Sequence, residues 1–320
     1  MSVQPEDVEE LRLPLIRYCY RLLGSAADSD DAAQETIIRA SKQVDRYDPG
    51  RARLTTWVHG IATNVCLDML RGRRRRALVM DLVPPAGGSD IGAPLSADHW
   101  VEPMPGQQLF GQADPADVAL ERESVRLAFV ALLQRVPPRQ RAVLVLRDVL
   151  AFSARETAEI VDASVPAVNS ALQRARQTLH AQPTEPHDLE NPTDADQVEL
   201  LQRYVTAFES HDVDALTAIL RADAISSMPP FAWWIRGGSA IASLMGSSDA
   251  CAGDRLIRTD INGWPGLGQY RPADNGVLRP FALISIDSSA AGISHIATFL
   301  GAGARFAEFG LPEDLGESTN

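Results

Sequence analysis

Apolar residues recur at steps of three and four along the N-terminal part of the chain, a spacing that places them on one face of a helix. The first such run covers residues 8–23, and Gly24 is expected to end it. The second covers residues 32–40, with Ser29 or Asp30 as the candidate N-cap. This pattern predicts two amphipathic helices separated by a short turn.

A third run begins near Thr56 and ends in five arginines within six residues, Arg71 to Arg76. Because the whole chain has a formal net charge of −12, this cluster departs from the average and indicates contact with a phosphate backbone. The alternative is a solvated basic turn or a helix C-terminus favoured by the helix dipole, which accounts for one or two arginines. The three runs predict an all-helical domain over residues 5–80.

A second helical block is expected over residues 116–181. The proline pair at 137–138 separates two apolar helical runs. Further on, Ser153 and Glu156 have the spacing of a capping box ahead of a short helix over 154–161.

A turn of three or four residues joins this short helix to the next, and Asp162 is expected to adopt the left-handed backbone conformation there. Ser164 is the candidate N-cap of the following helix, and Pro166 lies in its first turn, where a missing N–H is harmless. Two helices joined in this way predict a DNA-binding helix-turn-helix, with an ordinary helical hairpin as the alternative.

The second helix of this pair has two faces. Its apolar positions, expected to face inward, are Val165, Val168, Leu172, Ala175 and Leu179. The opposite face presents residue types that contact base edges in a major groove. These residues are Asn169, Ser170, Gln173, Arg174, Arg176 and Gln177.

The length of 320 residues suits two or three domains. Glycines and prolines without a regular period predict a flexible linker over residues 81–115. An acidic stretch with several prolines predicts a second linker over 182–194. The remainder, residues 195–315, has helical runs first and strand-like runs later, which predicts an α+β domain.

No apolar run approaches ~20 residues, and the N-terminus lacks the apolar segment of a signal peptide, so neither a membrane span nor export is expected. Cys19, Cys66 and Cys251 form no metal-binding or disulfide pattern, which fits a reducing cytoplasm. We expect no metal and no cofactor.

The two helical blocks together resemble a bacterial extracytoplasmic function (ECF, group IV) sigma factor. The resemblance covers roughly residues 8–181, in the order and spacing of the family. Several motifs in the right order are a far more specific signal than any one alone. The motifs are Asp31–Thr36, Trp57, Ala62–Arg71, Leu132–Leu133, Pro137–Arg141, Leu146–Leu150 and Asn169–Arg176.

The resemblance implies a role for each motif in region 2. Asp31, Gln34 and Glu35 would dock on the clamp helices of the largest polymerase subunit; otherwise they are a solvated helix face. Loop 46–53 and the Trp57 helix would open the minus-ten element and hold a flipped base. Trp57 is equally compatible with a core position. The implied minus-ten residues are Arg53, Trp57, Asn64, Asp68, Arg71, Arg73 and Arg74.

In region 4, the second helix of the helix-turn-helix would read the duplex minus-thirty-five element. The implied contacts are Pro166, Asn169, Ser170, Gln173, Arg174 and Arg176. Linker 81–115 would thread the RNA exit region. The factor itself would do no chemistry, because magnesium and catalysis belong to the polymerase.

Residues 195–315 resemble a SnoaL-like domain, a curved sheet wrapped by helices, of the version fused to one ECF subgroup. The resemblance is in Met228–Phe231, Trp233, Arg236–Gly237, Arg279–Ala282 and Phe309–Pro312. Relatives of the fold include isomerases and hydrolases with a polar group in an apolar pocket. Candidate pocket residues are Met228, Phe231, Trp233, Phe281 and His295.

Most of these candidates are better explained as ordinary core or interface residues. A lone histidine such as His295 is more often a hydrogen-bonded core residue than a catalyst, and spacing identifies no carboxylate partner for it. We therefore expect regulation, or sensing of a small ligand or protein, rather than catalysis. The competing hypotheses for the whole chain are a helix-turn-helix regulator acting without polymerase and a SnoaL-fold enzyme carrying a DNA-binding module.

Overall fold

The computed structural model describes residues 4–72, 75–86, 90–111, 122, 124–180, 194–247, 251–289 and 291–317. It divides into two compact units. The first comprises residues 1–78 and 98–183, and the second comprises residues 79–97 and 184–320.

Four helices open the first unit: α1 (Pro5–Glu9), α2 (Arg12–Leu23), α3 (Ala26–Lys42) and α4 (Leu54–Leu70). Gly24 ends α2 in the left-handed conformation, with φ of 68°, as expected. The expected N-cap of α3 was wrong: Ser25, not Ser29 or Asp30, accepts the hydrogen bond from the Asp28 N–H. The turn between α2 and α3 is therefore shorter than the sequence suggested.

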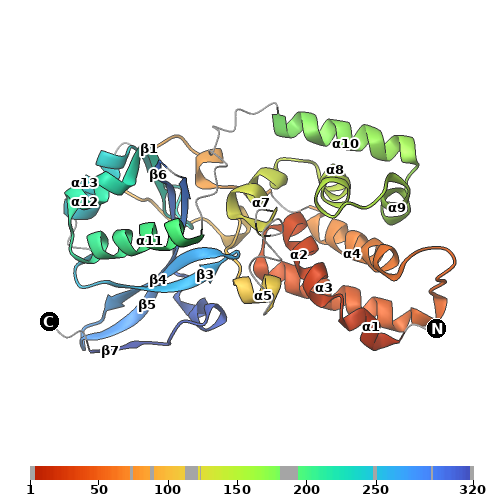
Figure 1. Cartoon of the computed structure of the whole chain (residues 1–320), viewed down its shortest axis with the longest axis horizontal. Helices are drawn as coiled ribbons and strands as arrows, with labels where there is room; N and C mark the ends of the chain where they lie inside the picture. Colours follow the sequence, from red (N-terminus) through yellow and green to blue (C-terminus); the bar gives the residue numbers. More distant parts are fainter. Residues whose placement is uncertain are drawn as a thin grey trace. The chain divides into compact units, whose positions relative to one another are not determined.

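Helices α2, α3 and α4 pack together (Figure 1). Leu15, Ala33 and Val58, one from each helix, are buried. The hydroxyl groups of Tyr18 and Thr63 share a buried hydrogen bond of 2.7 Å. A 3₁₀ turn, η1 (Val44–Arg46), follows α3. These contacts fix the orientation of α3 and α4, the two helices that contain the expected polymerase and minus-ten residues.

The second helical group contains α7 (Leu127–Gln134), α8 (Pro138–Leu144), a π-helical turn η4 (Val145–Val149), α9 (Ala154–Ile160) and α10 (Val165–His180). The capping box at the start of α9 is present, with Ser153 and Glu156 each accepting a backbone N–H from the other. Asp162 has a φ of 49°, as expected of the turn before α10. The helix-turn-helix geometry predicted from the sequence is confirmed.

Residues 81–115, expected to be a flexible linker, include short elements: η2 (Val79–Asp81), η3 (Ala97–His99) and α5 (Gly106–Phe110). Residues 98–110 pack on the first unit, where Tyr20 donates a hydrogen bond of 2.7 Å to the Glu102 carbonyl. Residues 79–97 pack on the second unit. The described parts of this segment therefore make specific contacts that the sequence pattern did not predict. The acidic linker over 182–194 lies almost wholly outside the described residues.

The second unit is α+β, as predicted. Its helices are α11 (Asp194–Glu209), α12 (Val213–Ile219) and α13 (Gly238–Ser247), and a 3₁₀ helix, η6 (Ala302–Phe309), follows the last long strand. The strands are β1 (Leu220–Ser227), β2 (Trp234–Arg236), β3 (Arg255–Ile261), β4 (Trp264–Pro272), β5 (Val277–Ser289), β6 (Gly292–Leu300) and β7 (Leu315–Glu317).

The strands form one sheet in the order β2-β1-β6-β5-β4-β3, with β7 paired to β5. All pairs are antiparallel except β1 with β6. Helices α11, α12 and α13 cover one face of this sheet (Figure 1). The core between them includes Tyr204, Leu216, Ile241, Ile284 and Ile296.

Candidate nucleic-acid and polymerase interface

The expected polymerase residues lie on one face of α3, at positions i, i+3 and i+4. Asp31 and Gln34 are exposed, and Glu35 is half-buried. The Gln34 side chain accepts a hydrogen bond of 2.8 Å from Arg12, and Glu35 forms an ion pair of 2.6 Å with Arg39. The face is therefore polar and accessible, with two of its three side chains already held in position.

The expected minus-ten residues are on α4 and just before it. Trp57 is half-buried, and its ring centroid lies 5.3 Å from that of Tyr47. Asn64, Asp68 and Arg71 are exposed along one strip of the helix, and Asp68 pairs with Arg71 at 3.3 Å. The structure thus brings these polar side chains together and leaves them accessible to a ligand.

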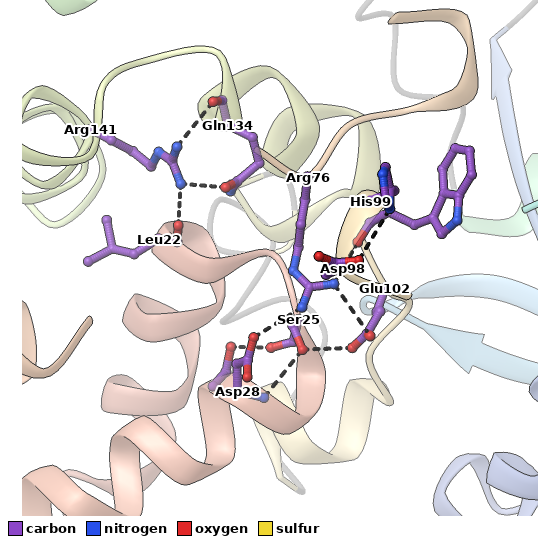
Figure 2. A network of polar contacts seen from close by, with 11 residues as sticks. Leu22, Ser25, Asp28, Arg76, Asp98, His99, Glu102, Gln134 and Arg141 are labelled. Carbon is purple, nitrogen blue, oxygen red and sulfur yellow. Dashed lines mark hydrogen bonds and ion pairs between the residues drawn. The ribbon is translucent and has the colours of Figure 1, made fainter. Parts of the chain in front are cut away.

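The arginine cluster has a mixed environment. Arg73 and Arg74 lie outside the described residues. Arg76 has only 11% of its side chain exposed, and it pairs with Asp28 at 3.0 Å and with Glu102 at 3.5 Å (Figure 2). Its position shows that the last arginine of the cluster anchors the chain that follows α4 to α3, a role that the sequence did not predict.

On α10, all six expected minus-thirty-five residues are exposed: Pro166, Asn169, Ser170, Gln173, Arg174 and Arg176. Arg176 donates two hydrogen bonds, of 2.9 and 2.7 Å, to the Asp148 carboxylate. Val168, Leu172 and Ala175 are buried as expected, whereas Val165 is 38% exposed, because it lies in the first turn of the helix. The recognition face predicted from the sequence therefore exists as a continuous polar surface.

Helix α4 also packs against α9. Arg53, at the N-terminus of α4, forms an ion pair with Glu156 and lies 5.9 Å over the ring of Phe152. His59 is buried, with its ring centroid 5.1 Å from both Tyr18 and Phe152, and burial lowers its pKa to about 4. One side of the expected minus-ten helix is consequently covered by the first helix of the helix-turn-helix and the turn before it.

A buried arginine joins the two helical groups at another point. Arg141 of α8 is 3% exposed and donates to the carbonyl of Leu22, at the end of α2, and to the side chain of Gln134 (Figure 2). Arg21 of α2 in turn donates to the Ser124 hydroxyl at 2.5 Å. The two groups form one compact unit in which guanidinium groups connect helix ends.

The candidate pocket residues of the second unit have different environments. Trp233 is buried, whereas Met228 and Phe231 are half-buried. The Phe281 ring lies beneath the Arg271 guanidinium, 3.6 Å from centroid to cation. Phe231 instead forms a backbone bridge with Pro94. These contacts favour packing roles for most of this set.

His295 has partners that sequence spacing did not reveal. Its Nε2 lies 2.9 Å from the Ser227 hydroxyl, and its Nδ1 lies 3.7 Å from a carboxylate oxygen of Asp287. Asp287 and His295 are opposite each other in the β5–β6 register, and Ser227 is on the neighbouring strand β1. The alternation of residues along β5 and β6, read across their hairpin, is the sequence signal that could have placed Asp287 opposite His295.

Among the described residues, no group of His, Cys, Asp and Glu is arranged to hold a metal ion. None of the described helices has the length and apolar character needed to cross a membrane.

Comparison with known proteins gives the family. Residues 8–76 match the family Sigma-70 region 2, and residues 126–179 match Sigma-70, region 4. The chain is 42% identical over 312 residues to the ECF RNA polymerase sigma factor SigG of Mycobacterium tuberculosis, covering 96% of this chain and 83% of SigG. It is 27% identical over 221 residues to SigJ of the same organism, covering 69% of this chain and 63% of SigJ.

The crystal structure of the Mycobacterium tuberculosis ECF sigma factor SigJ has the same fold, with a TM-score of 0.62 and 21% sequence identity. The match covers 96% of this chain and 99% of that one, so it includes the α+β unit expected to be SnoaL-like. The chain therefore belongs to the ECF RNA polymerase sigma factors, which bind core polymerase and direct promoter-specific transcription initiation.

Proposed function

We propose that α3 docks this sigma factor on the clamp helices of the largest polymerase subunit through Asp31, Gln34 and Glu35. The support is the exposure of Asp31 and Gln34 on one polar face, with Glu35 beside them. Carboxylates on such a face suit a basic partner surface, and charge complementarity then sets the orientation of docking. The site of action is accordingly the cytoplasm, where the polymerase is.

Promoter recognition is divided between the two helical groups. Helix α10 reads the minus-thirty-five duplex through the face that contains Asn169, Gln173 and Arg174, while α4 engages the melted minus-ten element. One observation carries this assignment: the exposed polar face of α10 follows a capped helix and a left-handed turn at Asp162. This arrangement presents a recognition helix to the major groove.

The contact between α4 and α9 has a consequence for initiation. Arg53 is an expected minus-ten residue, yet its guanidinium is engaged by Glu156, and the turn containing Phe152 covers His59. Reading two promoter elements requires regions 2 and 4 to lie apart on DNA. The α4–α9 contact therefore opens when the factor joins polymerase and promoter.

The C-terminal SnoaL-like domain tunes this activity and is not an enzyme. Support comes from residues 79–97, which lie in the segment between regions 2 and 4 but pack on the C-terminal unit. Trp234 donates a hydrogen bond of 2.9 Å to the Val83 carbonyl, and the Ala86 N–H donates one of 2.7 Å to the Trp234 carbonyl. A ligand or protein that shifts this domain thereby acts on the segment that joins the two promoter-binding regions.

Run-off transcription with purified core polymerase tests the proposal. We expect initiation with the full chain, and loss of core binding when Asp31 is changed to Lys, because the reversed charge opposes the basic clamp surface. Asp214→Lys is the matched control: it makes the same change at an exposed position on α12 and leaves core binding intact.

Initiation without any effect of Asp31→Lys on core binding would refute the docking face while leaving the promoter assignment in place. Duplex DNA binding with no core-dependent initiation would favour a regulator that acts without polymerase. The sign of C-terminal control follows from comparing the full chain with a chain ending near residue 181: equal levels and equal promoter choice would refute tuning by the SnoaL-like domain.

A further inference from the structure

A cavity of about 240 Å³ lies between the region 2 helices and the region 4 helices of the first unit. Its walls come from the α2–α3 turn, the chain that follows α4, and the turn between α7 and α8. Among the described residues that line it, four are arginines and two are aspartates. They are Arg75, Arg76, Arg135, Arg141, Asp28 and Asp98.

The charges of the six residues named above are unequal in number. Arg76 is paired with Asp28 and with Glu102, and Asp98 lies 3.2 Å from a ring nitrogen of His99 (Figure 2). Among the described residues, no carboxylate is paired with Arg75 or Arg141. Among the described lining residues, positive charges therefore outnumber negative ones.

Arg141 has an unusual environment for a cation. The five hydrogen bonds that its guanidinium donates within the described part of the chain all go to neutral oxygens, on Leu22, Gln134 and Val136. Burial and the nearby charge of Arg75 lower the pKa of Arg141 to about 9. An added anion would oppose both effects, because it would place a counter-charge next to two cations that repel each other.

We propose that this cavity binds a small phosphate-bearing anion, contacted by Arg75 from region 2 and by Arg135 from region 4. The planar guanidinium fork matches the oxygens of a phosphate group and forms paired, charge-assisted hydrogen bonds with them. The cavity has room for several water molecules, and thus for a diphosphate group. A DNA duplex is too wide to enter it, so the ligand is a small molecule and not the promoter.

Because both regions contribute arginines, the bound anion links them. A ligand that binds only the arrangement in which α4 and α9 are in contact stabilises that arrangement by mass action. The cavity thereby makes the compact form of regions 2 and 4 responsive to a phosphate-bearing metabolite. The binding itself does not depend on the proposed roles of α3 and α10, since it is measured without polymerase or promoter.

The test measures binding of inorganic pyrophosphate to the full chain by calorimetry at constant ionic strength. We expect binding to the native protein and about tenfold weaker binding to the double variant Arg75→Gln/Arg135→Gln, since two charge-assisted hydrogen-bond donors are lost. Arg155→Gln is the matched control: it removes one charge from α9, where the side chain is 86% exposed and outside the cavity, and should bind as the native protein does.

Arg75→Gln alone provides a second variant that keeps the fold, because Arg75 is exposed. We expect it to weaken binding as well, and pyrophosphate to slow amide exchange in α4 and α9 of the native protein only. No binding, or equal affinity in the native protein and both cavity variants, would overturn the site. Displacement of pyrophosphate by a short DNA duplex would also overturn it, because these arginines would then contact the DNA backbone.

Discussion

The Glu156 carboxylate accepts a hydrogen bond of 2.9 Å from the Ser153 N–H and at the same time forms an ion pair with Arg53. One oxygen therefore completes the capping box of α9, while the other holds the N-terminus of α4. The hydrogen bonds to Ser153, with Arg53 as a smaller cause, lower the pKa of Glu156. A local helix signal and a contact between two regions thus depend on the same side chain.

The two roles of Glu156 can be separated by mutation. Ser153→Ala removes the cap and is expected to cost about 1 kcal/mol of unfolding free energy. Coupling between Arg53→Gln and Glu156→Gln in a double-mutant cycle is expected to be under ~1 kcal/mol, because the Arg53 side chain is 68% exposed and the pair is screened. A coupling energy well above that value would show that the pair is desolvated in solution, contrary to this structure.

The pH dependence of the Glu156 contribution has a definite sign. Its folded-state pKa lies below its ordinary value, so its stabilisation is present above the ordinary glutamate pKa of about 4.3 and is lost as the pH falls through the folded value. Denaturant titrations of the native protein and Ser153→Ala at acidic pH check this. A loss of equal size in both proteins would show that the cap is not the cause.

Sequence patterns predicted the elements of this chain where local chemistry decides the structure. The capping box at Ser153 and the left-handed turn at Asp162 depend on neighbouring residues, and both are present. The α3 cap was assigned wrongly because Ser25, Ser29 and Asp30 have equivalent capping chemistry. Ser25 directly follows Gly24, where α2 ends, and this position makes Ser25 the N-cap of α3.

Other features depend on residues far apart in the chain, and periodicity does not report them. The sequence predicts an exposed position for a charged residue such as Arg141. It is nevertheless buried, because its guanidinium donates a hydrogen bond to the Leu22 carbonyl at the end of α2. His295 lies opposite Asp287 only because of the register in which β5 and β6 pair. Strands β2 and β7 have three residues each and are too short to show alternation.

Arg174 and Arg176 provide a matched pair on the recognition helix. Both are exposed, but Arg176 is bonded to Asp148. Arg174→Ala is expected to lower promoter-specific transcription about tenfold with core binding retained, since a base or phosphate contact is lost. Arg176→Ala should instead loosen the packing of α10 on η4, seen as faster amide exchange there. Loss of core binding in Arg174→Ala would contradict its assigned role.

His59 is expected to make stability pH-dependent between pH 6.5 and 4. Its folded pKa of about 4 is below the ordinary value of 6.5, so the unfolded chain binds a proton that the folded chain does not. Stability is therefore unaffected by His59 above pH 6.5 and falls by up to about 3 kcal/mol as the pH drops to 4. Urea titrations of the native protein and His59→Phe check this, because Phe retains the ring contacts and cannot be protonated. An identical pH dependence of both proteins would refute the assignment.

The attachment of residues 79–97 to the C-terminal unit depends on Trp234, which is 6% exposed. Trp234→Phe removes the indole donor to the Val83 carbonyl but retains the aromatic packing and the backbone bond with Ala86. The loss of one hydrogen bond, worth about 1 kcal/mol, is expected to speed amide exchange at Ala86 about fivefold.

Trp264→Phe is the control for this change, because Trp264 begins β4, near the opposite edge of the sheet from β2. Exchange at Ala86 should be unchanged in that variant.

If Trp234→Phe also leaves exchange at Ala86 unchanged, the indole bond does not hold the segment. If exchange rises throughout β1 and β6 as well, the substitution has destabilised the sheet. A rise confined to residues 79–97 would show that this segment can be released from the C-terminal domain without unfolding it, as tuning of the joined regions by that domain requires.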